Sequence, residues 1–229
     1  QAPGLDWTAY FETAGLAGQP RIVPWQPEAI RKLAALVAEE PLQVWKNYLL
    51  FHAINENAAL LPKKYAELRF QFYTRTLEGT PKQPERWKRA LEALNEDLGD
   101  AVGKLYVQKY FPASSKAEVE QMVKNILAAF GDRVDALDWM TAATKQKAKA
   151  KLASLVVSVG YPETWRDYAE LEIRPDDALG NHQRAELAEY RHRLAELGRP
   201  SDRREWWMTP QTVNAVNLPL QNALNFPAA

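Results

Sequence analysis

The stretch RWKRALEALNEDLGDAVGKLYVQKYF, residues 86–111, decides the fold class of this 229-residue chain. Its apolar residues follow one another at steps of three or four positions, which is the spacing of one face of an α-helix. They are Trp87, Leu91, Leu94, Leu98, Val102 and Leu105. The stripe predicts one long helix, and the segments on both sides repeat the same kind of spacing.

The part of the chain before this stretch is also expected to be helical, with proline and glycine marking the ends of its segments. Pro27 occupies the first turn of a predicted helix over 27–40, where proline is well tolerated. Pro41 starts a second helix that is expected to reach Leu61. A third is predicted over about 63–77.

Three more helices are predicted after the opening stretch. Ser115 and Glu118 form a capping-box pattern that is typical of a helix start. Thr141 is placed to cap the next helix, which is expected to run toward Val157. The last helix is expected from about Pro175 to Leu197, with Gly198 as its cap, because glycine accepts the left-handed conformation that commonly follows a helix.

The character of the chain changes after about residue 200. Thr209–Ala229 contains three prolines, and the β-branched Thr212 and Val213 lead into Asn214, so a short extended strand and turns are expected. Four amide side chains follow at close intervals: Asn214, Asn217, Asn222 and Asn225. Because an exposed sheet edge can pair with an extended peptide, this segment is a candidate for peptide recognition by strand addition.

The composition excludes several classes of function. Lys plus Arg and Asp plus Glu both number 29, so no overall field attracts nucleic acid or an anionic membrane surface. Cysteine is absent, which excludes disulfides, a thiolate nucleophile and a cysteine zinc knuckle. No apolar run approaches the ~20 residues that span a bilayer. We therefore expect no nucleic-acid partner and no membrane span in this segment.

Histidine is scarce, since the chain has only His52, His182 and His192. The zinc motif HExxH needs two histidines at i and i+4 with a glutamate beside the first, and the sequence has no such arrangement. Glu189 and His192 have the spacing of di-iron bundles, but those bundles need a second copy of the motif. His52 lies on an apolar face and is interpreted as a packing residue. No catalytic residue and no metal ligand are therefore predicted.

Stretches along nearly the whole chain resemble one family of peptidases, and the block over 101–168 is the most specific. The matching stretches are Pro41-Leu42, Trp45-Lys46, Leu61–Lys63, Ala101–Val107, Lys109–Phe111, Leu137–Met140, Thr144-Lys145, Lys151-Leu152, Gly160–Pro162, Trp165–Tyr168, Trp207–Ala215 and Phe226–Ala229. In this order they resemble the neprilysin, endothelin-converting enzyme and bacterial oligopeptidase O family of zinc metallopeptidases.

This resemblance implies a mainly α fold, in which the helical cap lobe of a two-lobed metallopeptidase is followed by a short extended segment that begins the thermolysin-like catalytic lobe. We expect the cap lobe over 1–172, and the linker helix with the first edge strand and turns over 173–229. In the family, an Asn-Ala pair after Thr-Val lies on an edge strand that binds the substrate peptide. The matching residues, Asn214 and Ala215, are the expected substrate-binding residues. The HExxH motif is expected beyond Ala229.

Two departures from the family pattern fall on the same segment. The pair Val216-Asn217 stands where the family usually has two aromatic residues. Asn222–Asn225 reads Asn-Ala-Leu-Asn, where the family usually has Asn-Glu-Ile-Val before Phe-Pro-Ala. Because both changes lie on the expected substrate strand, the resemblance implies subsites that differ from the usual ones.

The parent protein is expected to be a zinc metalloendopeptidase that hydrolyses short peptides. This fragment would supply the size-restricting lid and part of the substrate strand, bind no zinc, and be inactive alone. Its expected partners are oligopeptide substrates and the remainder of its own catalytic lobe. The alternative is a non-catalytic helical binding or scaffold module that retains the family fold. An HExxH motif downstream in the gene would favour the enzyme, and a stop codon would favour the module.

The expected compartment is the periplasm or the extracellular cell surface of a bacterium, with the cytoplasm as the alternative. The chain lacks cysteine and Asn-x-Ser/Thr glycosylation sites, which argues against a disulfide-bonded animal ectoenzyme.

Overall fold

The computed structural model describes residues 2–229, and the mainly α fold predicted from the sequence is confirmed. Contacts divide this part of the chain into two compact units. The first comprises the chain up to Glu85, Arg174–Asn181 and Tyr190–Ala195, and the second comprises Arg86–Ile173, His182–Glu189 and Glu196–Ala229. Helix α8 (Ala178–Glu196) contributes to both units. The expected division into lobes at 1–172 and 173–229 remains a prediction.

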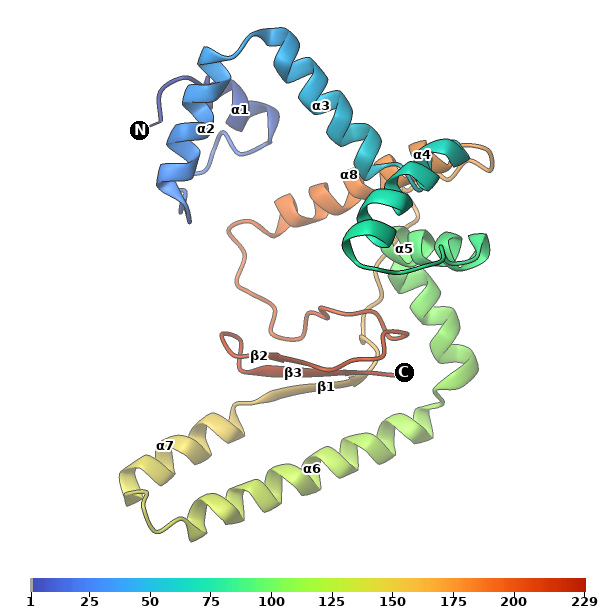
Figure 1. Ribbon diagram of the computed structural model, residues 1–229. Coiled ribbons are helices and arrows are strands. Elements are labelled where there is room, and N and C mark those ends of the chain that lie inside the picture. Colours follow the sequence, from blue (N-terminus) through green and yellow to red (C-terminus); the bar gives the residue numbers. More distant parts are fainter. Residues whose placement is uncertain (1) are drawn as a thin grey trace. The chain divides into compact units, whose positions relative to one another are not determined.

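The first unit consists mostly of helices (Figure 1). They are α1 (Trp7–Thr13), α2 (Pro27–Glu39), α3 (Leu42–Glu56), α4 (Lys63–Arg69) and the π-helix η1 (Phe70–Leu77). The helix predicted over 27–40 is confirmed as α2, which has Pro27 in its first turn. The helix predicted over 63–77 is α-helical only to Arg69, after which the turns widen and Glu78 donates its backbone N–H to the carbonyl of Tyr73.

The second unit contains the longest helices and a small sheet (Figure 1). Its elements besides α8 are α5 (Arg86–Tyr110), α6 (Ala113–Ala136), α7 (Ala142–Ala153), β1 (Val156–Gly160), β2 (Val216–Leu218) and β3 (Ala223–Pro227). Helices α6 and α7 form an antiparallel pair, and β1 follows α7 directly. The predicted cap at Thr141 is confirmed, because its hydroxyl accepts from the backbone N–H of Thr144.

Helix α5 confirms the long helix predicted from the opening stretch, with a local break at Leu98, where φ is −132° and ψ is 33°. The apolar stripe is not its buried face, since Trp87 is 61% exposed and Leu105 is 68% exposed. The buried positions are Gly99, Gly103 and Val107, one turn apart on another face. Spacing alone therefore predicted the helix but not the side that packs within this chain.

Three boundary predictions are wrong. Helix α3 ends at Glu56 rather than reaching Leu61. Helix α6 begins at Ala113 directly after Pro112, which lies at the N-cap, so Ser115 is inside the first turn and forms no capping box. The fixed φ of proline favours a helix start at the next residue, which pre-empts the hydroxyl cap. Helix α7 ends at Ala153 instead of running toward Val157, because the β-branched residues that follow form β1.

The sheet has the strand order β1-β3-β2, with β3 in the centre. Strand β1 pairs with β3 in parallel, with Val156 opposite Ala223, and β2 pairs with β3 antiparallel, with Leu218 opposite Ala223. The extended tail predicted over Thr209–Ala229 thus contains both β2 and β3. Thr212 and Val213, which were expected to be in a strand, lie in a turn before β2.

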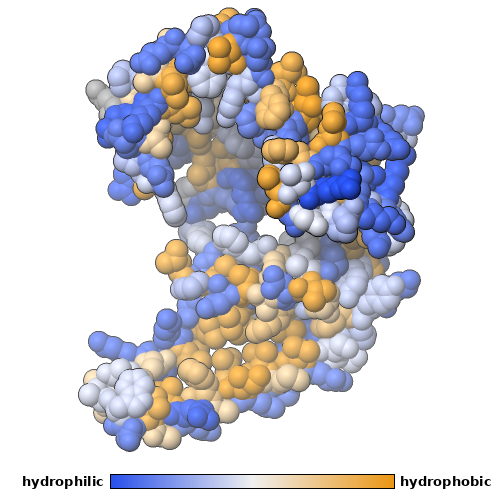
Figure 2. Space-filling model, in the orientation of Figure 1, coloured by the Kyte–Doolittle hydropathy of each residue, from blue (hydrophilic) through white to orange (hydrophobic). Residues whose placement is uncertain are grey.

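The buried core is small and the exposed apolar surface is large. Buried residues of the second unit include Val134, Val159, Ala223 and Asn225. Figure 2 shows apolar side chains gathered over the region of α6 and the strands. On α6, every fourth residue forms an exposed stripe, which consists of Met122, Ile126 and Phe130 at 56–59% exposure. Exposed apolar stripes of this kind usually mark surfaces that pack against another chain or segment.

Candidate peptide-binding edge

The segment Thr209–Gln211 docks onto a glycine groove of α5. A Cβ atom on Gly99 would lie 2.6 Å from Cγ2 of Thr209, and one on Gly103 would lie 2.6 Å from Cδ of Pro210. Real Cβ contacts are longer, so only glycine admits this approach. Gln211 fixes the segment further, because its Nε2 donates to the backbone carbonyl of Gly99 at 3.1 Å. Pro210 is wholly buried.

Asn214 and Ala215, the expected substrate-binding residues, follow this anchor directly. Both are exposed, and both lie just before β2 rather than within it. The Oδ1 atom of Asn214 accepts from the backbone N–H of Ala215 at 2.8 Å, which fixes the side chain against the main chain. The side chain therefore presents its Nδ2 group to solvent as a potential donor.

Strand β2 is an edge strand, since within residues 2–229 it pairs on one side only, with β3. It is three residues long, and its middle residue, Asn217, is exposed while Val216 and Leu218 are half-buried. An edge strand carries backbone N–H and C=O groups that its single neighbour does not use. Those groups can accept an extended peptide as a further strand.

The turn between β2 and β3 is held by Arg203, a residue that belongs to none of the sequence motifs. Its guanidinium donates to the backbone carbonyls of Gln221, Asn222 and Ser154 at 2.6, 3.0 and 2.5 Å. The partners are main-chain oxygens, which every residue has, so no sequence pattern marks them. Asn222 itself has a positive φ of 48°, a conformation that asparagine tolerates better than most residues.

A partly buried polar cluster joins α5 to α8 in the second unit. The Nδ1 atom of His182 lies 2.6 Å from Oδ1 of Asp97, and its Nε2 atom lies 3.5 Å from Oε1 of Glu186. Arg166 pairs with Glu189, which lies on α8 together with His182. Sequence spacing relates His182 and Glu189 only to metal-binding motifs. Their partners are 85 and 23 residues away, so adjacency in sequence could not reveal them.

Two side chains that interact with this cluster, Asp100 and Tyr168, have raised pKa values. Burial raises the pKa of the Asp100 carboxyl above its ordinary value of 3.8, the charge of Arg166 lowers it, and the charge of Glu189 raises it. Burial also raises the pKa of Tyr168 above 10.0, and the negative charge of Asp100 adds to that effect. The cluster thus contains a carboxyl group whose ionised form is disfavoured in the folded protein.

The residues of this chain do not fit a catalytic zinc ion. His52 packs within an aromatic group, with its ring centroid 4.3 Å from that of Tyr48. His182 is engaged by Asp97 and Glu186, as described above. Among residues 2–229, no three His, Asp or Glu side chains lie together as metal ligands would.

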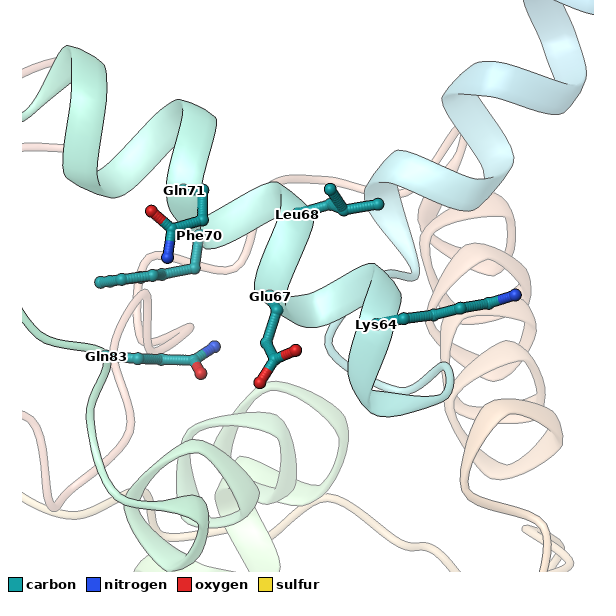
Figure 3. A pocket seen from close by; sticks show the side chains of 6 residues that line it. All are labelled: Lys64, Glu67, Leu68, Phe70, Gln71 and Gln83. Carbon is teal, nitrogen blue, oxygen red and sulfur yellow. The ribbon is translucent and has the colours of Figure 1, made fainter.

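A shallow recess beside α4 and η1 in the first unit offers no alternative site (Figure 3). It encloses about 650 Å³ and is lined by Lys64, Glu67, Leu68, Phe70, Gln71 and Gln83. Figure 3 shows Glu67 and Gln83 pointing toward one another, whereas Lys64 and Leu68 point away. Binding sites need polar groups that converge on a ligand, and these side chains do not converge.

Over residues 2–229, no helix is both long and apolar enough to cross a membrane.

Comparison with known proteins agrees with the family resemblance. The model of peptidase family M13 matches residues 1–162. Neprilysin-3 of Drosophila melanogaster is 29% identical over 245 residues, which cover 99% of this chain and 31% of the relative. The neutral endopeptidase of Lactobacillus helveticus is 32% identical over 211 residues, which cover 91% of this chain and 32% of the relative.

Solved structures agree with these relatives. The open state of the zinc metalloprotease Zmp1 of Mycobacterium tuberculosis matches with a TM-score of 0.88 and 40% identity, over 98% of this chain and 35% of that one. PepO of Lactobacillus rhamnosis matches with a TM-score of 0.75 and 31% identity, over 98% of this chain and 38% of that one. The chain spans about a third of the length of the curated relatives it matches. Since the family model matches well over half of its residues, this chain belongs to peptidase family M13.

Proposed function

We propose that this chain is part of a zinc-dependent metalloendopeptidase that hydrolyses short peptides. Within that parent protein it forms the size-restricting helical lid and part of the substrate-binding edge strand. Asn214 and Ala215 bind the peptide main chain, and the zinc ligands and catalytic groups come from other parts of the parent. By itself the chain neither binds catalytic zinc nor cleaves peptides.

One observation carries the binding role. Asn214 and Ala215 are exposed at the start of β2, which has a single paired neighbour in the described chain. The buried Pro210 and the neighbouring Gln211 anchor the chain just upstream, so the strand is held in place before a peptide arrives. A preorganised edge loses less conformational entropy on binding than a mobile one, which favours affinity.

The large exposed apolar surface supports the proposal that the chain works as one part of a larger protein. Met122, Ile126 and Phe130 form an exposed apolar stripe on α6. Exposure of such a stripe to water is unfavourable, so we propose that another part of the parent covers it. Helix α3 is similar, because Leu49, Leu50 and Phe51 are 58–62% exposed on successive positions around it. The remainder of the parent's own catalytic lobe is the partner that we propose for these surfaces.

The parent is proposed to act in the periplasm or at the outer surface of a bacterial cell. The cytoplasm is the alternative. The chain has no cysteine and no Asn-x-Ser/Thr site, which argues against a disulfide-bonded animal ectoenzyme but does not distinguish the two bacterial compartments. Substrates in such a compartment would be free oligopeptides, which suits a peptidase that excludes folded proteins.

A comparison of the full-length protein with residues 1–229 tests this function. The full-length protein should contain zinc in a 1:1 ratio and hydrolyse short internally quenched peptides, and a chelator should abolish both properties. The isolated chain should show neither. Zinc at a 1:1 ratio with chelator-sensitive hydrolysis in the isolated chain would contradict the proposed division of roles. Absence of hydrolysis in the zinc-loaded full-length protein would contradict the enzymatic function itself.

A further inference from the structure

We propose that Arg203 is a positioning residue for peptide binding, which sets the place of the edge strand β2 without touching the substrate. The inference rests on the proposed function of β2 and assigns to that site a residue outside it. Strand β2 is held only weakly by its own hydrogen bonds. A three-residue strand with one neighbour has few hydrogen bonds of its own, so anchors at its ends must decide where it lies.

The upstream anchor is the glycine groove of α5, where Pro210 is buried and Gln211 donates to Asn95 and to Gly99. It fixes the chain three residues before Asn214. Downstream, Leu218 is half-buried opposite the wholly buried Ala223, but the turn after it lacks an apolar anchor at Leu220, which is fully exposed. Polar contacts must therefore hold that end.

Arg203 supplies most of those contacts from a single side chain. Its Nε atom donates to the carbonyl of Gln221, and its Nη2 atom donates to the carbonyls of Asn222 and Ser154. Gln221 and Asn222 belong to the turn that joins β2 to β3, and Ser154 ends α7 just before β1. One guanidinium thus ties the turn of the substrate strand to the entry of the opposite edge strand, two segments that lie side by side in Figure 1.

The same turn has a second tie that fixes its direction. The Nδ2 group of Asn222 donates to the carbonyl of Lys151 at 2.9 Å and to Oγ of Ser154 at 3.0 Å. The backbone N–H of Val156 donates to the carbonyl of Asn222 at 3.0 Å. Arg203 therefore completes a hydrogen-bond network that connects the end of α7 to the β2–β3 turn.

Arginine is suited to this role in a way that lysine is not. Its planar fork presents Nε–H and Nη2–H groups in fixed directions, so one side chain reaches neighbouring carbonyls together. Lysine keeps the positive charge but supplies a single ammonium, which cannot reproduce that geometry. The adjacent Arg204 is a matched control, because it is 73% exposed and contacts only Glu163 among the ion pairs, at 3.6 Å.

The test uses the full-length protein, with the variants Arg203→Lys, Arg203→Met and Arg204→Lys and one short internally quenched peptide that the wild type cleaves. We expect KM to rise by about fivefold or more in Arg203→Met and by less in Arg203→Lys, with kcat within about twofold of the wild type, because only uniform peptide binding is weakened. Backbone hydrogen exchange should accelerate over 212–222 and stay unchanged over α5 and α6. Arg204→Lys should match the wild type in both measurements.

Two results would overturn the inference. One is an Arg203→Lys protein whose KM and exchange over 212–222 both match those of the wild type. The other is a fall in kcat with an unchanged KM, or a general acceleration of exchange, either of which would indicate a merely structural role. If the wild type cleaves no peptide, the proposed function fails, and the exchange pattern alone decides whether Arg203 positions β2.

Discussion

Gly103 of α5 and Pro210 are packed so closely that a Cβ atom on Gly103 would lie 2.6 Å from Cδ of Pro210. This contact, with the parallel one between Gly99 and Thr209, seats the segment that leads to Asn214. Strand β2, the proposed substrate strand, is therefore positioned by a helix more than a hundred residues earlier in the chain. The position of the binding edge depends on two residues that have no side chain.

Gly103→Ala should destabilise the protein by about 1–3 kcal/mol, because the added methyl group overpacks the contact with the ring of the buried Pro210. Thermal unfolding of the full-length protein measures the effect. Gly131→Ala is the matched control, since its Cβ would lie at an ordinary 3.9 Å from Cδ2 of Leu152 in α7. That change should stabilise α6 by about 0.5–1 kcal/mol. Equal effects of the two variants would show that Pro210 does not need the groove.

Asn214→Ala in the full-length protein should raise KM for a short peptide by about 2- to 10-fold, which corresponds to one hydrogen bond of about 0.5–1.5 kcal/mol. The reason is the loss of the exposed Nδ2 donor beside β2. Steady-state kinetics provides the measurement. Asn47→Ala serves as the control, because Asn47 lies on α3 and pairs with Gln43 of the same helix. An unchanged KM and kcat for Asn214→Ala would remove this residue from the binding site.

The parts of this structure that the sequence predicted are those with local causes. Thr141 caps α7 because its hydroxyl reaches Thr144, three residues away, and Gly198 has the expected positive φ, 77°, because the preceding helix ends there. The site depends on distant pairings instead. Val156 is opposite Ala223 in the sheet, and the guanidinium of Arg203 binds carbonyls on both sides of that pairing. Neither relation follows from a periodic pattern or from a residue type.

The buried face of α5 shows the same limit in another way. The stripe that includes Leu91 and Leu94 has helical spacing, yet both side chains are 43% exposed. The segment that packs on α5 contains Thr209 and Pro210, and it lies close to the helix backbone. Glycine allows this close approach, whereas the side chain of leucine would block it. Apolar spacing predicts where a helix forms, but it does not identify which surface a particular neighbour requires. The family resemblance, carried by specific stretches rather than by periodicity, is what predicted the role of Asn214.

Asn225 on the central strand β3 should tolerate valine better than aspartate. It is 0% exposed, its Nδ2 atom has no hydrogen-bond partner within residues 2–229, and its Oδ1 accepts only at 3.5 Å from the N–H of Trp207. Asn225→Val removes an unpaired buried donor and should change stability by less than about 1 kcal/mol. Asn225→Asp buries an unpaired charge and should cost about 3 kcal/mol or more near neutral pH. Thermal midpoints of the two variants, measured together, should differ in that order, and the reverse order would contradict this description of the site.

Asp100→Asn should stabilise the protein at neutral pH and lose this advantage in acid. Burial raises the pKa of Asp100 in the folded protein above 3.8, so the folded state holds its proton more tightly than the unfolded chain does. Below the unfolded pKa both states are protonated and the carboxyl imposes no cost. As the pH rises through the folded pKa, the unfolded chain ionises more readily, and the wild type loses stability that asparagine, which does not ionise, retains.

Thermal midpoints of Asp100→Asn and the wild type, measured from about pH 4 to about pH 7, should therefore diverge with increasing pH. Arg166 keeps a carboxylate partner in the variant, because it also pairs with Glu189. Asp135→Asn is the control, since Asp135 is exposed and its ion pair with Lys149, at 2.6 Å, should contribute little. A wild type that is more stable than Asp100→Asn at neutral pH would mean that the attraction of Arg166 outweighs burial at this carboxyl group, and the direction assigned to its pKa would be wrong.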